Sequence, residues 1–320
     1  MKIVAADIGG THARFALAEL RPDARPQIGA MRKYRTRDFP GLGEAWLRFA
    51  QDSGGALPRA ASLAVAAPIE GETLSFMNSG WRIGRHGLKD ELGVDTLMLL
   101  NDFGAVAHSV SVMEADELVP LAGPGDLPAE GTASVIGPGT GLGVSILDRR
   151  QGGVRVIETE AAHIGFSPLD PEEEELADFL VARYGRASVE RIVSGPGLID
   201  INMFLGGGEH DPDKAAQLWE TAIAGADARA ERALSILVRC FGAAAGDIAL
   251  AHGAMGVAIT GGLANRIVHL LKSPAFEARF TAKGRYRERM LRTPVRLLTH
   301  EEPGLLGAAI AFQREWRNEP

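Results

Sequence analysis

The stretch SVIGPGTGLGVSIL, residues 134–147, places four glycines at alternate positions between two apolar runs rich in β-branched residues. This pattern predicts two strands joined by a glycine turn, and turns of this kind commonly hold an anion or a phosphate. It is not a Walker loop, because Val144 and Ser145 follow Gly143 where Lys and then Ser or Thr would stand. It is not the dinucleotide fingerprint either, because its glycines, Gly137 to Gly143, are spaced by two throughout. A tight hairpin with no ligand, whose glycines supply positive φ angles, is the alternative.

The beginning of the chain repeats this arrangement. A strand expected over residues 3–6 leads into ADIGGT, residues 6–11, and a second strand follows over 14–20. A strand, a glycine turn and a strand thus open both halves, which predicts two similar α/β lobes facing a central cleft that holds the ligand. Backbone N–H groups at Gly9 and Gly10 could cradle phosphate oxygens, with Asp7 holding a water of a magnesium shell and Thr11 offering a hydroxyl. A plain hairpin with a capping Asp is the alternative.

Composition sets limits on the class of protein. The chain has 320 residues, of which 46% are hydrophobic and 23% charged, which is ordinary for a soluble protein and long for one core. A net charge of −7 argues against a nucleic-acid surface. The single cysteine, Cys240, excludes a disulfide framework and a thiolate zinc cage. Neither a secretory signal nor an apolar run of about 18 residues is visible, so we expect no membrane partner and a cytoplasmic location.

The remaining pattern alternates between strands and helices. Strands are expected at 28–34, 61–67, 73–77, 96–100, 154–159, 256–260 and 295–298. Helices are expected at 42–51, 88–92, 103–110, 171–184, 213–252 with a break near 225, 263–271 and from 303 onward. The Pro- and Gly-rich residues 120–131 indicate a boundary or a surface loop. The acidic run 172–175 is interpreted as the solvated first turn of its helix.

Several polar residues stand where strands are expected to end. Asn101 and Asp102 follow the strand at 96–100; Asp102 is either a helix cap or a general base at the carboxyl end of a sheet strand. Glu160 and His163 follow the strand at 154–159, and Glu190 precedes SGPG. These three side chains suit hydrogen bonds to a hydroxyl-rich ligand better than a metal, because no further His or Cys lies nearby. Ordinary surface or capping roles are the alternative for each.

A third glycine turn comes near the carboxyl end. Gly261 and Gly262 lie between an expected strand and an expected helix, where glycine admits close approach by a flat ring or a sugar. An ordinary strand-to-helix loop is the alternative.

Together these motifs resemble a known superfamily. ADIGGT, GPGTGLG and ITGGLANR resemble the phosphate-1, phosphate-2 and adenosine motifs of the sugar kinase, actin and Hsp70 ATPases, whose lobes are of the ribonuclease H-like type. LLNDFGAVA, ETEAAHIGFSP and VERIVSGPGL are similar to the bacterial glucokinase family. The resemblance covers almost the whole chain. It implies a small α/β lobe over residues 1–112 with 303–320 and a large α/β lobe over 113–302.

The resemblance also implies a reaction and a set of site residues. The reaction is transfer of the γ-phosphoryl group of ATP, with Mg²⁺, to the 6-hydroxyl of glucose in glycolysis, by a cytoplasmic homodimer with Asp102 as the base. Glucose ligands would be Asn101, Asp102, Glu160, His163 and Glu190. ATP would contact Ala6, Asp7, Ile8, Gly9, Gly10, Thr11, Gly137, Gly139, Thr140, Gly141, Gly261 and Gly262, with Asp7 also binding Mg²⁺ through water.

Two departures and three rival functions accompany this reading. His12 stands where the family usually has Asn, and Ala161–Ala162 stand where it has Gly-Gly. A sugar-sensing regulator on the same fold would add a helix-turn-helix, for which no room is visible before the strand that begins at residue 2. A repressor-like hexose kinase would carry a cysteine-rich zinc motif. An actin- or chaperone-like ATPase would lack the hydroxyl-binding residues.

Overall fold

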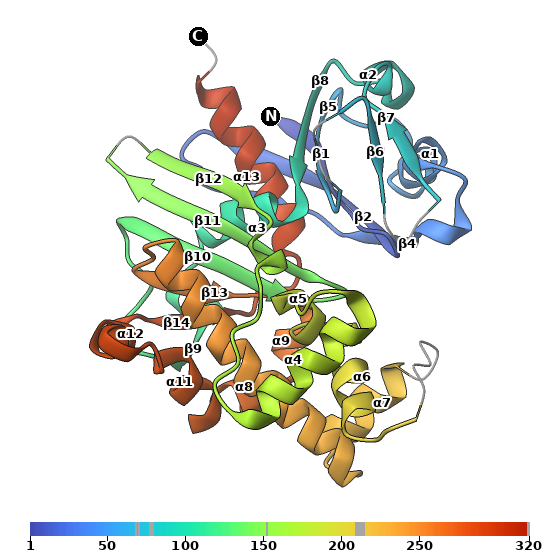
Figure 1. Cartoon of the computed structure of the whole chain (residues 1–320). Helices are drawn as coiled ribbons and strands as arrows, with labels where there is room; N and C mark the ends of the chain where they lie inside the picture. The colour runs from blue at the N-terminus through green and yellow to red at the C-terminus, as the bar shows by residue number, and fades with distance from the viewer. Residues whose placement is uncertain (68, 70, 77–79, 152, 209–214, 319–320) are drawn as a thin grey trace. The chain divides into compact units, whose positions relative to one another are not determined.

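The computed structural model describes the chain except residues 68, 70, 77–79, 152, 209–214, 319 and 320 (Figure 1). It forms two compact units. The first unit is Met1–Met113 with His300–Pro320, and the second is Glu114–Thr299.

The sheet of the first unit is built around β1 (Lys2–Ile8). Strand β2 (His12–Arg21) returns antiparallel to β1, while β5 (Ala60–Val65) and β8 (Thr96–Asn101) follow as parallel neighbours. All residues of β5 are buried, as expected for a parallel strand covered on both faces. The strand order is β3-β2-β1-β5-β8, and β4 also pairs with β2. The other strands of this unit are β3 (Ala24–Ile28), β4 (Arg32–Arg35) and the separate pair β6 (Thr73–Ser75) and β7 (Arg82–Gly84).

Helices cover both faces of this sheet. Ile3 and Ala5 of β1 share a core cluster with Leu305 of α13 (Pro303–Asn318), while the alternate residues of β1 pack in a cluster with Trp46 of α1 (Leu42–Asp52). The alternation follows from the two-residue period of a strand. Helix α13 also packs closely on α3: a Cβ on Gly307 would overlap the carbonyl oxygen of Ala105. The other helices are α2 (Leu88–Leu92), α3 (Asp102–Val110) and the short 3₁₀ turn η1 (Thr36–Asp38).

The sheet of the second unit repeats the first. Its centre is β10 (Gly131–Pro138), which pairs antiparallel with β11 (Leu142–Arg150) and parallel with β13 (Gly256–Ile259). The order is β12-β11-β10-β13-β14-β9, so β11-β10-β13-β14 corresponds to β2-β1-β5-β8. The predicted internal repetition of α/β lobes is therefore confirmed. The outer strands are β12 (Gly153–Thr159), β14 (Val295–Leu298) and β9 (Leu118–Ala122).

The core of the second unit is organised by α8 (Ala228–Ala251). This helix is long and apolar enough to cross a membrane, yet 78% of its most apolar window is buried within the protein, which identifies it as a core helix. The expected break near residue 225 separates it from α7 (Ala215–Ile223). The other helical elements are α4 (Pro171–Tyr184), α5 (Val189–Ile192), α6 (Gly195–Phe204), α9 (Gly262–Arg266), α10 (Val268–Leu271), α11 (Pro274–Thr281), α12 (Arg287–Arg292) and the 3₁₀ turns η2 (Ala115–Glu117), η3 (Ala161–His163) and η5 (Gly284–Tyr286).

Some expected elements differ in the structure. The single strand expected over 28–34 is two strands, β3 and β4, and the N–H of Gly29 between them donates to the carbonyl of Leu17. The expected boundary at 120–131 begins inside β9, which pairs with β14 through Pro120. The helix expected over 263–271 is α9 and α10, which meet at Ile267. Of the strand expected over 73–77, residues 73–75 form β6, and residue 77 lies outside the described residues.

The acidic run at 172–175 is not simply a solvated face. Glu173 is completely buried, and its Oε2 accepts hydrogen bonds from Arg279 of α11 and from the N–H of Leu169. Glu172 pairs with Arg232 and Arg239 of α8. The expectation is therefore wrong for these two residues, because their arginine partners lie 60 or more positions away and leave no local pattern.

Candidate functional site

The first glycine turn is held from outside by η1. Pairing of β1 with β2 ends at Ile8 and Ala13, and the N–H of Gly9 donates to the carbonyl of His12 at 2.9 Å. Thr36 donates its hydroxyl to the carbonyl of Gly10 at 2.7 Å and its N–H to the carbonyl of Thr11 at 3.1 Å. The side chains of Ala6 and Ile8 are buried in the core. These two residues can therefore offer a ligand only their backbone, whereas Gly10 and Thr11 are accessible.

Asp7 is the last residue but one of β1 and belongs to a chain of charges beside this turn. Its Oδ2 lies 3.1 Å from Nη1 of Arg14, and Nε of Arg14 lies 3.3 Å from Oε2 of Glu302. Burial raises the pKa of the Asp7 carboxyl and of Glu302, while Arg14 opposes both shifts. Helix α13 approaches so closely that a Cβ on Gly304 would lie 2.9 Å from Cγ of Asp7. The carboxylate of Asp7 therefore lies at the turn, with its charge partly neutralised by Arg14.

Asn101 and Asp102 lie at the same sheet edge as this turn. The parallel register aligns Ile8 with Val65 and Val65 with Asn101. Oδ1 of Asn101 accepts the N–H groups of Phe103 at 2.9 Å and Gly104 at 3.3 Å, so Asn101 is the N-cap of α3. Asp102 is the first residue of α3, and its Oδ1 also accepts the N–H of Phe103 at 2.9 Å. The first unit thus gathers the glycine turn and both polar residues at the carboxyl ends of its strands.

The second glycine turn is also a hairpin, but its glycines do not serve to supply the positive φ angles that the hairpin alternative expected. Pro138 pairs with Leu142, the N–H of Gly139 donates to the carbonyl of Gly141 at 2.7 Å, and the N–H of Gly195 donates to the carbonyl of Gly139 at 2.7 Å. Among the described glycines with positive φ, none belongs to this ladder. Close approach requires Gly141 instead: a Cβ there would lie 2.5 Å from Oε2 of Glu190.

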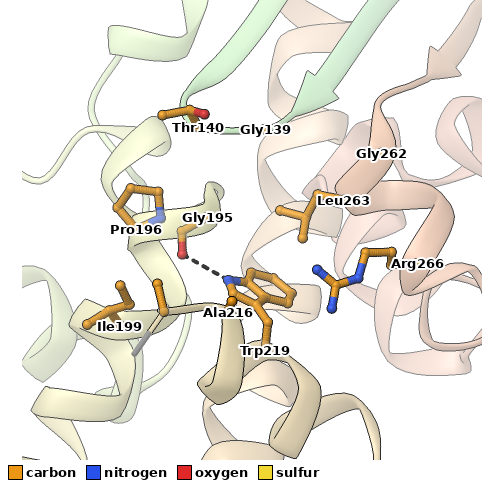
Figure 2. Close-up of a pocket in the computed structure, with 11 residues that line it drawn as sticks. Gly139, Thr140, Gly195, Pro196, Ile199, Ala216, Trp219, Gly262, Leu263 and Arg266 are labelled. Carbon is orange, nitrogen blue, oxygen red and sulfur yellow. Dashed lines mark hydrogen bonds between the residues drawn. The ribbon is translucent and has the colours of Figure 1, made fainter. Parts of the chain in front are cut away.

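A pocket of about 440 Å³ opens beside this turn (Figure 2). In Figure 2 the Trp219 ring, Pro196 and Leu263 surround one space below Gly139 and Thr140, and Nε1 of Trp219 donates to the carbonyl of Gly195 at 3.1 Å. Most of the wall is apolar, with Arg266 contributing one charge, which suits a flat ring carrying a polar edge. The lining residues are Gly139, Thr140, Gly195, Pro196, Ile199, Ala215, Ala216, Trp219, Gly262, Leu263 and Arg266.

The pocket joins two of the predicted glycine motifs. Gly139 and Thr140 come from the hairpin and Gly262 begins α9. Gly261 lies against the hairpin: with φ of 98°, its Cβ would be 2.9 Å from the carbonyl oxygen of Pro138. The sequence indicated no role for Trp219. Arg266 is the last residue of ITGGLANR. SGPG supplies Gly195 and Pro196, and its Ser194 caps α6 by accepting the N–H of Gly197.

The other three predicted polar residues lie together in the second unit. Nε2 of His163 is 3.6 Å from Oε2 of Glu160, and Nδ1 of His163 is 3.9 Å from Oε1 of Glu190. The N–H of Val189 donates to the carbonyl of Ile164, which draws α5 alongside η3. Oε2 of Glu190 accepts the N–H of Leu142 at 2.9 Å. Among the described residues, no group of three or more His, Cys, Asp or Glu could hold a metal.

The match to known proteins decides the family. The profile described as Glucokinase matches residues 4–315. The chain belongs to the glucokinase family. The glucokinase of Zymomonas mobilis subsp. mobilis is 44% identical over 320 residues, 99% of each chain.

Solved structures agree on the fold. The crystal structure of a glucokinase from an Antarctic psychrotroph superimposes with a TM-score of 0.84 at 30% identity, covering 98% of this chain and 99% of the other. A ROK family glucokinase from Streptomyces griseus, in complex with glucose and AMPPNP, gives a TM-score of 0.64 at 20% identity over 98% and 100% of the two chains, a likeness of fold alone. The predicted family and the α/β, actin-like ATPase fold are confirmed.

Proposed function

We propose that this member of the glucokinase family transfers the γ-phosphoryl group of ATP to the 6-hydroxyl of glucose, giving glucose 6-phosphate and ADP. Besides family membership, one observation carries the proposal. The hairpin turn at Gly139 and the turn at Gly262 border a single apolar pocket, which is the arrangement that a nucleoside triphosphate requires: a dry site for the base next to backbone donors for phosphates.

In this proposal the nucleotide base occupies the pocket against Trp219 and Leu263. The phosphates extend along the hairpin turn, where a Cβ on Gly139 would meet no atom within 4 Å, so that the space beside the turn is open to a ligand. The predicted contacts at Gly137, Thr140 and Gly141 belong to this turn. In the first unit the predicted contacts are the backbone and Thr11 at the turn that Asp7 precedes, and we expect these to serve the terminal phosphates.

Mg²⁺ is proposed to arrive with ATP. A magnesium ion that binds nucleotide phosphates needs only one or two protein carboxylates and keeps several waters, and Asp7 supplies one carboxylate at the turn. When bound, the ion would neutralise phosphate charge. Nη1 of Arg14 donates to Oδ2 of Asp7 at 3.1 Å and would hold this carboxylate in position beside the ion.

The chemical step needs a base and a fixed acceptor. We propose that Asp102 accepts the proton of the 6-hydroxyl while that oxygen bonds to the γ-phosphorus and the bond to the β-phosphate oxygen of ADP breaks. The N-terminus of α3 favours a carboxylate at Asp102. Asn101, Glu160, His163 and Glu190 would orient the sugar by hydrogen bonds. Because water can also attack ATP, we expect the site to become complete only after glucose binds.

The cellular setting is proposed on family resemblance. A homodimer in the cytoplasm that supplies glycolysis with glucose 6-phosphate is the arrangement that the resemblance implies, and the proposed domains are a small lobe near 1–112 with 303–320 and a large lobe near 113–302. Size-exclusion chromatography with light scattering would test the dimer directly.

The proposal is tested by replacing the base. In an assay of ADP formation with glucose and ATP, Asp102→Ala should lower kcat by about 10²–10⁴-fold. Calorimetry should still detect glucose binding to this variant. Asp90→Ala is the matched control, since Asp90 is an exposed aspartate in the first turn of α2. Turnover of Asp102→Ala close to that of the control would refute the assignment. The same assay with mannose, glucosamine and other donors would define the substrate range.

A further inference from the structure

We propose that Glu190 is a positioning residue that couples sugar binding to the phosphate-binding hairpin. The inference rests on the proposed function, because it takes Glu160, His163 and Glu190 as sugar ligands. It adds a second task for Glu190, performed by the carboxylate oxygen that faces away from His163.

The two oxygens of Glu190 face different parts of the site. Oε1 lies 3.9 Å from Nδ1 of His163, on the side of the proposed sugar ligands. Oε2 accepts the N–H of Leu142 at 2.9 Å, and Leu142 is the residue that closes the hairpin opposite Pro138. A carboxylate is planar and rigid, so a ligand that fixes one oxygen also fixes the other.

Residues 190–195 form hydrogen bonds to both sides of the hairpin turn. Glu190 holds Leu142 at one end of the turn, and five residues later Gly195 donates its N–H to the carbonyl of Gly139 at 2.7 Å. The backbone between these contacts is firmly packed, since Ile192 and Val193 are completely buried. A change in the orientation of Glu190 therefore acts on the turn rather than being absorbed by the segment.

The sugar side of the same carboxylate is open. The side chains of His163 and Glu160 are 55% and 78% exposed, whereas that of Glu190 is 24% exposed. A sugar hydroxyl that bridges His163 and Glu190 would restrict the carboxylate and so strengthen its hold on Leu142. Coupling of two binding sites is reciprocal, so a nucleotide ordering the hairpin must raise glucose affinity by the same factor that glucose raises nucleotide affinity.

Two glycines of the turn provide a matched pair of variants. A Cβ on Gly141 would lie 2.5 Å from Oε2 of Glu190, whereas a Cβ on Gly139 would meet nothing within 4 Å. Gly141→Ala should displace the carboxylate and weaken glucose binding by about 5-fold or more when no nucleotide is present. Gly139→Ala should keep the wild-type glucose Kd, with any loss confined to nucleotide binding.

The measurement is calorimetric titration of glucose into the full-length protein, with and without AMPPNP. If the wild type binds no glucose, the proposed function fails. If the wild type binds glucose and both glycine variants match its Kd, the coupling role of Glu190 is refuted while the proposed function stands.

A second pair of variants tests the same inference if Gly141→Ala does not fold. Without glucose, Glu190→Ala should weaken AMPPNP binding, although Glu190 does not line the nucleotide pocket. Glu190→Gln should restore that binding, because its amide oxygen can accept the N–H of Leu142. An AMPPNP Kd for Glu190→Ala equal to that of the wild type would overturn the inference.

Discussion

Glu173 and Glu174 are neighbours in the first turn of α4, yet only Glu173 is buried. Its ion pair with Arg279 joins α4 to α11. Removing one partner of a buried pair leaves the other charge uncompensated, so Glu173→Ala should lower the free energy of unfolding by about 3–5 kcal/mol. Glu174→Ala removes an exposed first-turn acid and should cost about 1 kcal/mol at most. Urea unfolding followed by tryptophan fluorescence would measure both.

A companion variant separates the pair from its packing. Within the described part of the chain, Oε1 of Glu173 and Nε of Arg279 lack hydrogen-bond partners, so the pair is incompletely satisfied. Replacing both residues by Met should therefore recover most of the stability lost in Glu173→Ala. Equal unfolding midpoints for Glu173→Ala and Glu174→Ala would contradict the structural role of this ion pair.

Local sequence patterns indicated some of the site residues but not those that depend on contacts between distant parts of the chain. Asn101, Asp102 and the glycines stand at strand ends in conspicuous local patterns, so their positions could be predicted. Trp219 reaches the pocket only because its helix packs beside α6 and its indole donates to Gly195. Likewise, the bond from Leu142 to Glu190 joins residues 48 positions apart. Contacts of this kind depend on tertiary packing and leave no periodic signal.

At the scale of elements, α3 and α13 are joined by a half-buried histidine, His108. Nη1 of Arg314 lies 2.9 Å from Nδ1 of His108, and Nη2 donates to the hydroxyl of Ser111 at 2.6 Å. Burial, and then the Arg314 charge, lowers the pKa of His108 to about 4 from its ordinary 6.5. The unfolded chain therefore binds this proton at a higher pH than the folded chain does. The stabilisation is complete above about pH 6.5 and is lost as the pH falls towards 4.

His108→Asn should remove this dependence while leaving a side-chain oxygen for Arg314. Thermal unfolding of the wild type and the variant between pH 7.5 and 4.5 would test it. Protonating carboxylates lowers both melting temperatures, so the relevant quantity is their difference, which should shift in favour of the variant below pH 6.5. Parallel curves over this range would mean that His108 does not link α3 to α13 in the way described.

Elements with continuous apolar runs were the most predictable. β1, β5 and α8 are buried along most of their length, and their apolar character is visible locally. In contrast, β9 contains Pro120 and pairs only at the edge of its sheet with β14, so its composition suggested a loop. Helices α11 and α12 carry several charged residues, and one of them, Arg279, is buried against the distant Glu173.

At the scale of the whole molecule, the proposed sugar ligands come from both units. Asn101 and Asp102 belong to the first unit, and Glu160, His163 and Glu190 to the second. If one glucose molecule contacts both sets, its binding must stabilise both units against local opening. Glucose at saturation should therefore slow amide hydrogen exchange in α3 and also in η3 and α5, as measured by mass spectrometry on the full-length protein.

L-Glucose is the control, because it has the same composition and solvent effects but the opposite handedness. Helix α12 provides an internal reference, since none of its residues belongs to the proposed sugar or nucleotide sites and its exchange should not change. Adding AMPPNP with glucose should extend protection to the turn at residues 139–141, because that turn lies beside the pocket. Protection by glucose restricted to one unit would show that the sugar does not bridge the two sets of ligands, and Asp102 could then not act on a hydroxyl held by His163 and Glu190.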